Sequence, residues 1–137
     1  MDAGRILDHQ WVDDGPGWAA VEVSSAEEVL ALEPDFSGLP EAMVGVVGAR
    51  GRRGPGEAAY EVRAFAPGAG VAEDPVTGSL NASIGQWFLA RGDVPLPYTV
   101  SQGARVGRAG LLTVSHVEGA VWVGGAAITR IVGEVAM

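Results

Sequence analysis

The stretch that decides the fold is EDPVTGS at residues 73–79, directly before an apolar segment with helical spacing. It combines carboxylates, a proline and a Thr-Gly-Ser turn. The first turn of a helix has backbone N–H groups without intrahelical partners and a partial positive charge, so it can hold a carboxylate or phosphate. Glycine in that turn lets a ligand approach the backbone closely. The stretch therefore predicts a binding site for a small acid.

The segment that follows is predicted to be an enclosed helix. It has no charged residue in positions 75–90, while Leu80, Ile84 and Phe88 recur at helical spacing and small residues fill the other side. A helix on a protein surface normally has a charged face, so a helix without one is expected to be covered by strands. Arg91-Gly92 supplies a cation and a stop at its C-terminal end.

Composition restricts the class of protein. With 137 residues the chain is expected to form one domain, residues 1–137. Its net charge of −8 argues against nucleic acid and anionic membranes as partners. The sequence has no membrane-spanning run and no signal peptide, which favours a cytoplasmic location. It has no cysteine, which excludes disulfides and thiol-based catalysis, and its 21 glycines suit a strand-rich fold.

The remaining segments predict an α+β fold with a curled, mostly antiparallel sheet around the central helix. Ser25 to Glu28 match a capping box for a second, outer helix that ends at Pro34. Glu118-Gly119 and Gly124-Gly125 are expected to be hairpin connections. About seven strands are expected, from the strand-like residues 6–12, 18–23, 43–49, 60–66, 98–101, 111–117, 120–123 and 126–135.

Several other chemistries are weakly supported. Ser79 lacks the G-x-S-x-G setting of a hydrolase nucleophile, and only His9 and His116 could act as its base. The two carboxylates at residues 73–74 do not form a zinc or calcium spacing with a histidine, so no metal site is expected. The glycines at residues 68–70 lack the third glycine of a dinucleotide fingerprint, and no lysine completes a P-loop.

Two features have both a structural and a functional interpretation. Asp74 before a proline is a good helix N-cap that needs no ligand, or it is a ligand contact. Glycine inside the first turn costs roughly 0.5–1 kcal/mol against alanine, so Thr77-Gly78-Ser79 favours the ligand interpretation. Residues 50–56, with three arginines and three glycines, are an anion-binding patch or a solvated turn, and the solvated turn is favoured.

Residues 62–67 (VRAFAP) and 73–79 closely resemble the second half of the PhzF-like isomerases of phenazine biosynthesis. Further matches are HQWVD at residues 9–13 with GPGW at residues 15–18, YTVSQG at residues 98–103 and VGG at residues 123–125. The resemblance spans most of the chain, residues 7–134.

The resemblance implies a diaminopimelate-epimerase-like fold, which has two similar halves, each a curled sheet around a central helix, with the active site between them. In that family the N-termini of the central helices face the cleft and receive the substrate carboxylate. By this resemblance Asp74 is the aspartate of the motif, Gly78 and Ser79 contact the substrate, and Thr77 shapes the turn.

The resemblance also implies proton transfer without a metal or organic cofactor, by a carboxylate acid/base where related epimerases use two thiols. The absence of cysteine agrees with the carboxylate version. Family members are about twice as long as this chain, and their acid/base glutamate belongs to the first half. Glu73 matches the acidic position of the motif and not that base. No catalytic residue is therefore expected in this chain.

Three hypotheses follow. The chain is the substrate-binding half of a PhzF-like isomerase that needs an N-terminal half. That half is either a separate polypeptide or another region of the same protein. Alternatively it is a non-catalytic module that binds a small acid, or a homodimer whose two copies imitate the two halves. Without the other half, apolar surface would be uncovered, so a dimer or higher assembly is expected.

Overall fold

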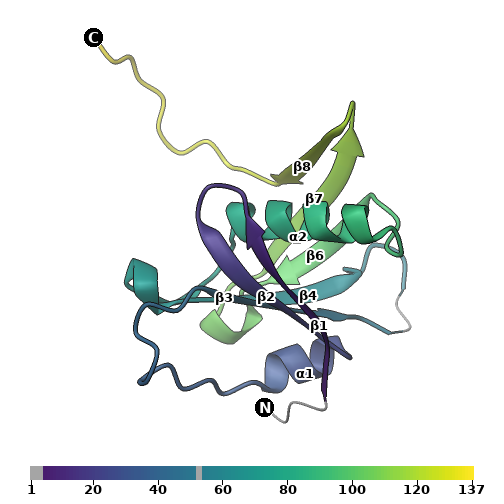
Figure 1. Ribbon diagram of the computed structural model, residues 1–137. Coiled ribbons are helices and arrows are strands. Elements are labelled where there is room, and N and C mark those ends of the chain that lie inside the picture. The colour runs from purple at the N-terminus through teal and green to yellow at the C-terminus, as the bar shows by residue number, and fades with distance from the viewer. Residues whose placement is uncertain (1–4, 52–53) are drawn as a thin grey trace.

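The computed structural model describes residues 5–51 and 54–137. It contains one eight-stranded sheet and two α-helices, one on each face of the sheet (Figure 1). The elements are β1 (Ile6–Asp13), β2 (Gly17–Val23), α1 (Ala26–Ala31), β3 (Val44–Ala49), β4 (Tyr60–Ala66), η2 (Pro67–Ala69), β5 (Val71–Asp74), α2 (Gly78–Arg91), β6 (Tyr98–Gln102), η3 (Ala104–Val106), β7 (Gly110–Val117) and β8 (Ala120–Gly125), where η marks a 3-10 turn.

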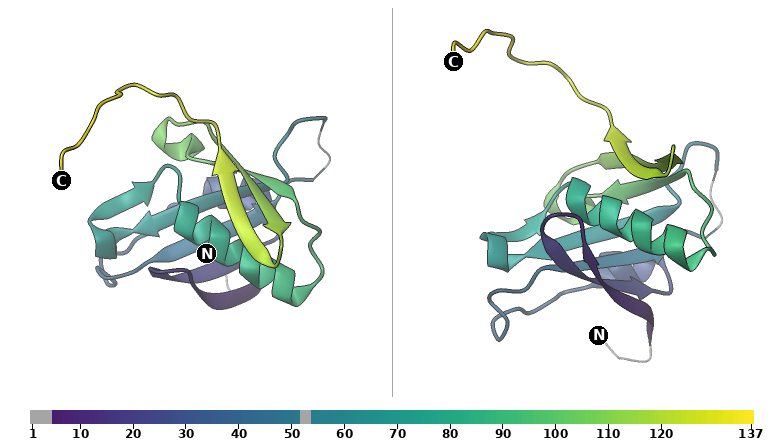
Figure 2. Two further views of the ribbon diagram at one scale, coloured as in Figure 1. Left: turned by 90° about the horizontal axis from the view of Figure 1, so that it is seen from above. Right: turned by 45° about the horizontal axis from the view of Figure 1, so that its top comes forward.

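The sheet has the order β1-β2-β3-β4-β6-β7-β8, and the short strand β5 pairs with β4. Pairing is parallel between β2 and β3 and between β4 and β6, and antiparallel in the other pairs. The sheet curls so that β1 at one edge and β7 and β8 at the other both contact α2 (Figure 2). The predicted fold class, a curled and mostly antiparallel sheet around a central helix, is confirmed.

Helix α2 is enclosed as its lack of charge predicted. The main core cluster joins Leu80, Ile84 and Phe88 to residues of β1, β2, β3, β4, β6 and β7. Gly85 lies where β7 and β8 approach, since a Cβ on it would be 2.7 Å from Val114 Cγ1 and 2.9 Å from Val121 Cγ1. In the described residues no helix is long and apolar enough to cross a membrane.

The end of α2 is also as expected. Gly92 has φ 80°, and its N–H bonds to Phe88 O at 3.0 Å, which is a left-handed helix stop. The preceding Arg91 pairs with Glu22 at 2.5 Å and with Asp93 at 2.6 Å. The hydrogen bond that Arg91 donates to the Glu22 carboxylate is the main cause that raises the pKa of Arg91. These contacts fix the C-terminal end of α2 to strand β2.

The outer helix α1 covers the opposite face of β2, β3 and β4. Half of its capping box is confirmed, because Glu28 N donates to Oγ of the N-cap residue Ser25 at 3.2 Å. The Glu28 carboxylate reaches back to Ser24, whose N–H donates to it at 3.1 Å. Val29 packs in a second apolar cluster with residues of β2, β3 and β4.

Three predictions about strands need correction. Residues 126–135 form no strand, and in Figures 1 and 2 this segment leaves the body as an extended trace after β8. Gly124-Gly125 is no hairpin, because both residues pair with β7 inside β8. Strand β5 was not expected, because it is only four residues long and depends on β4 for pairing. The Glu118-Gly119 turn is confirmed, with φ of 50° and 82°.

Candidate functional site

Helix α2 begins in an open first turn. Thr77 is its N-cap residue, with extended backbone angles and no side-chain capping bond. The first intrahelical hydrogen bond runs from Asn81 N to Thr77 O at 3.1 Å. The N–H groups of Gly78, Ser79 and Leu80 precede that bond and have no capping side chain in the described part of the chain. Gly78 is exposed, so this end of the helix is accessible to a small anion.

A cavity of about 410 Å³ lies beside this turn. Gly78 and Val76 form one side of it, and the beginning of β7 and the end of β8 form the other. Three further glycines contribute only backbone to its wall. The remaining lining residues are Ala109, Gly110, Leu111, Leu112, Val123, Gly124, Gly125 and Ala126.

Asp74 and Thr77 are held together across the turn. Thr77 Oγ1 donates a hydrogen bond to Asp74 Oδ2 at 2.6 Å. Thr77 is buried and Asp74 is half-buried at the end of β5. The aspartate therefore has a structural partner as well as its predicted role as a ligand contact. This hydrogen bond explains why an aspartate occurs three residues before Thr77.

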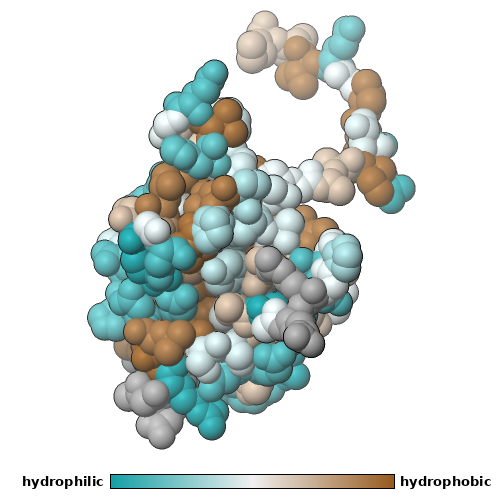
Figure 3. Space-filling view, turned by 90° about the vertical axis from the view of Figure 1, so that its right-hand side faces the viewer, coloured by the Kyte–Doolittle hydropathy of each residue, from teal (hydrophilic) through white to brown (hydrophobic). Residues whose placement is uncertain are grey.

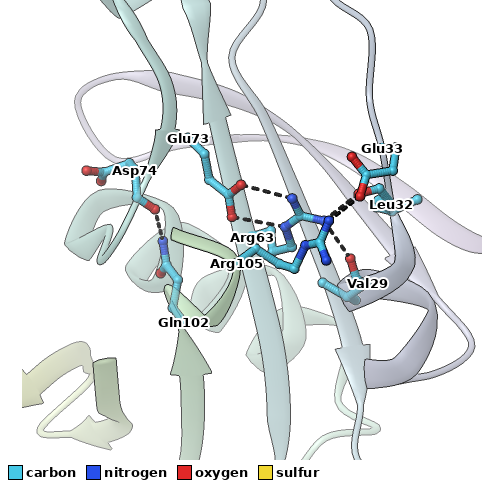
Figure 4. A network of polar contacts seen from close by, with 8 residues as sticks. All are labelled: Val29, Leu32, Glu33, Arg63, Glu73, Asp74, Gln102 and Arg105. Carbon is cyan, nitrogen blue, oxygen red and sulfur yellow. Dashed lines mark hydrogen bonds and ion pairs between the residues drawn. The ribbon is translucent and has the colours of Figure 1, made fainter. Parts of the chain in front are cut away.

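Gln102 fixes this turn, a role that was not predicted from its place in the YTVSQG match. Its Nε2 donates to Asp74 O at 3.0 Å, which Figure 4 shows, and to Thr77 Oγ1 at 2.9 Å. Its Oε1 accepts from Thr77 N at 3.1 Å and from Asn81 Nδ2 at 2.9 Å. Gln102 is 1% exposed at the end of β6, so a buried amide determines the shape of the turn. The available signal was a lone glutamine ending an otherwise strand-like segment.

Ser79 lies in the first turn of α2 and is half-buried. Its Oγ accepts a hydrogen bond from Trp18 Nε1 at 3.4 Å, and its carbonyl accepts one from Ser83 Oγ at 2.7 Å. His9 and His116 are exposed on β1 and β7, and no described base bonds to the Ser79 hydroxyl. The structure thus does not bring together a serine nucleophile and its base.

Glu73 forms an ion pair with Arg63 on the face of the sheet that α1 covers. Its two carboxylate oxygens accept from Arg63 Nε and Arg63 Nη2, both at 2.9 Å (Figure 4). Arg63 also donates to the carbonyls of Val29 and Leu32 at the end of α1, at 3.1 and 2.7 Å. Neighbouring residues of a strand point to opposite faces, so Glu73 faces α1 while Asp74 is next to α2. Glu73 is therefore a structural residue and not a free base.

In the described part of the arginine-rich loop, Arg50 is held by a carboxylate of the protein itself. Arg50 Nη2 bonds to the fully buried carboxylate of Glu61 at 2.5 Å, so this arginine already has an anionic partner. A larger cavity of about 640 Å³ lies between this loop and the beginning of β6, and Arg50 and Tyr60 are among its lining residues. Residues 52–53 of the predicted patch lie outside the described residues. Among the described residues, no three His, Asp or Glu side chains gather in a metal-binding group.

Comparison with known proteins gives a consistent result. The family model described as "Phenazine biosynthesis-like protein", PhzC-PhzF, matches residues 2–133. "Antisense-enhancing sequence 1" of Schizosaccharomyces pombe is 34% identical, over 90% of this chain and 45% of that protein. "Uncharacterized isomerase YddE" of Escherichia coli is 32% identical, over 64% of this chain and 32% of that protein. The chain thus spans less than half the length of these curated relatives.

Solved structures show the same fold. A PhzF-family phenazine biosynthesis protein of Bacillus anthracis superposes with a TM-score of 0.65 at 16% identity, over 88% of this chain and 46% of that one. A PhzF-family protein of Enterococcus faecalis superposes with a TM-score of 0.63 at 23% identity, over 90% of this chain and 48% of that one. In both cases the chain corresponds to about half of the neighbour.

Proposed function

The chain belongs to the phenazine biosynthesis-like (PhzC-PhzF) family, and on this premise we propose that it is the substrate-binding half of a PhzF-like isomerase. The reaction is the movement of a proton on a small carboxylate-bearing substrate, without metal or organic cofactor. The observation that carries the proposal is the uncapped start of α2, which opens beside a cavity. Its N–H groups and dipole would bind the carboxylate and stabilise charge as a proton leaves carbon.

The roles of the four site residues follow from their positions. Gly78 and Ser79 offer backbone N–H groups in the first turn, and Ser79 adds a hydroxyl. Thr77 shapes the turn through its bonds to Asp74 and Gln102. Asp74 would contribute its carboxylate at the edge of the turn, where Thr77 Oγ1 donates to its Oδ2.

The acid/base belongs to a companion half in this proposal. Of the two carboxylates in the decisive stretch, Glu73 is paired with Arg63 and Asp74 accepts from Thr77. Neither is placed as a free base, because each already has a hydrogen-bonding partner. A glutamate from the companion half would supply that group. The relatives, about twice as long or longer, have room for such a half.

Exposed apolar residues give the companion half a place to bind. The segment after β8 carries Ile128, Ile131, Val132 and Val135, of which Ile131 is 91% exposed. Figure 3 shows a strip of hydrophobic residues between hydrophilic flanks on one side of the molecule. Strands β1 and β8 have unpaired edges that could accept further strands. A second copy of this chain is the alternative occupant of these surfaces, and would make a homodimer.

Deuterium incorporation from D2O into dihydro-hydroxy aromatic acids, followed by NMR, tests the catalytic part. The chain alone should give no incorporation, and the chain mixed with a polypeptide that carries the first half of the family fold should give it. Robust incorporation by the chain alone would contradict the proposal that the acid/base is absent from it.

A non-catalytic acid-binding module is the second candidate, favoured by the absence of a free base among the described residues of the site. Both candidates require carboxylate binding. Asp74→Ala and Ser79→Ala should each weaken it by about 1–3 kcal/mol if buried hydrogen bonds are lost. Gln86→Ala, exposed on the same helix, is the control. Unchanged affinity in both variants would mean that the stretch only begins the helix.

A further inference from the structure

We propose that Trp18 is a positioning residue that directs the hydroxyl hydrogen of Ser79 toward the bound carboxylate. The inference rests on the proposed carboxylate site at the start of α2. Trp18 lies on β2, and its indole Nε1 donates to Ser79 Oγ at 3.4 Å across 61 positions of sequence. This is a contact between the curled sheet and the first turn of the central helix.

The chemistry of the two groups determines the direction of the hydrogen bond. An indole N–H is a donor only, so Ser79 Oγ must be the acceptor in this contact. The hydroxyl hydrogen of Ser79 is then free to donate elsewhere, and no acceptor for it is present in the described part of the chain. Carboxylates accept hydrogen bonds and do not donate them. Trp18 thereby leaves Ser79 in the donor orientation that an anion at the helix start requires.

The surroundings of Trp18 make it a fixed donor. The side chain is 3% exposed and packs in the main core cluster with Val12 and Leu80. A buried indole ring cannot turn without displacing its neighbours, so its N–H keeps one direction. Its contact with Ser79 is long for a hydrogen bond. Donation by Ser79 to an anion makes its oxygen a better acceptor, so ligand binding should shorten this contact.

A double-mutant cycle with benzoate as the probe tests the coupling, with affinity measured by calorimetry. Trp18→Phe should raise the dissociation constant about fivefold, and Ser79→Ala should raise it by a similar factor. The double variant should match Ser79→Ala within about twofold, because Trp18 acts through Ser79. If the double variant instead raises the dissociation constant by the product of the two single factors, the two residues act independently and the inference is overturned. Trp87→Phe is the matched control, a half-buried tryptophan on α2.

The indole N–H resonance of Trp18 gives a second measurement in the unaltered protein, which does not depend on the folding of Trp18→Phe. Saturating benzoate should shift this resonance downfield in the wild type, and the shift should disappear in Ser79→Ala. A resonance that stays in place while benzoate binds would overturn the role of Trp18 and leave the carboxylate site intact. No benzoate binding to the wild type would overturn the site and the inference together.

Discussion

Glu73→Gln should lower the free energy of unfolding, because it leaves the guanidinium of Arg63 without its carboxylate in the protein interior. The side chain of Arg63 is 6% exposed and that of Glu73 is 11% exposed, so water replaces little of the lost interaction. Removing one partner of a buried ion pair costs about 3–5 kcal/mol. Arg63 keeps two carbonyl acceptors at the end of α1, and glutamine still accepts one bond. The expected loss is therefore about 2–4 kcal/mol.

Urea-induced unfolding followed by tryptophan fluorescence measures this loss. Glu27→Gln, an exposed glutamate on α1, should change the free energy of unfolding by less than about 0.5 kcal/mol. Arg63→Met combined with Glu73→Leu should be less destabilised than Glu73→Gln alone, because it leaves no unpaired charge. The affinity of folded Glu73→Gln for benzoate should equal that of the wild type.

If Glu73→Gln is as stable as Glu27→Gln, the Arg63–Glu73 ion pair does not stabilise the fold. If Glu73→Gln keeps its stability and loses benzoate binding, Glu73 belongs to the ligand site. The two outcomes separate an ion pair that contributes nothing from a misassigned functional residue.

Three further expectations concern stability. Gly85→Ala should destabilise by about 1–3 kcal/mol in thermal unfolding despite the better helix propensity of alanine, because its Cβ would meet Val114 and Val121, whereas Gln86→Ala should be nearly neutral. Burial raises the pKa of Tyr98, so the unfolded chain loses this proton first and stability should fall as the pH rises above about 10; urea unfolding at high pH should show a smaller fall for Tyr98→Phe. Deleting residues 126–137 should leave the thermal midpoint unchanged, because this segment pairs with no strand of the sheet, and a large drop would count against its extended placement.

The central helix could be predicted from its lack of charged residues. No charged residue occurs in positions 75–90, and burial of Leu80, Ile84 and Phe88 follows from that pattern. The start of the helix was also recognisable, because Gly78 in the first turn destabilises a helix and is therefore expected only where a ligand approaches the backbone. These features are local, and local patterns are what a sequence displays.

The contacts that the sequence did not reveal join residues on different elements of the fold. Gln102 binds Asp74 and Thr77 from strand β6, and Arg63 pairs with Glu73 from the neighbouring strand β4. Residues 126–135 are rich in β-branched side chains, as strands are, but a strand also needs a neighbour to pair with. The sheet formed by this chain ends at β8 and does not include them. Composition gives the propensity, and the partner decides whether a strand forms.

The most direct test of the central claim is a titration of the isotope-labelled chain with acetate and benzoate, in which every backbone amide is followed by NMR. The largest shifts should occur at the N–H groups of Gly78, Ser79 and Leu80, with smaller changes at Gly124 and Gly125 across the cavity. If the largest shifts instead occur around Arg50, or if these amides stay unchanged at saturating ligand, the start of α2 is not a carboxylate site.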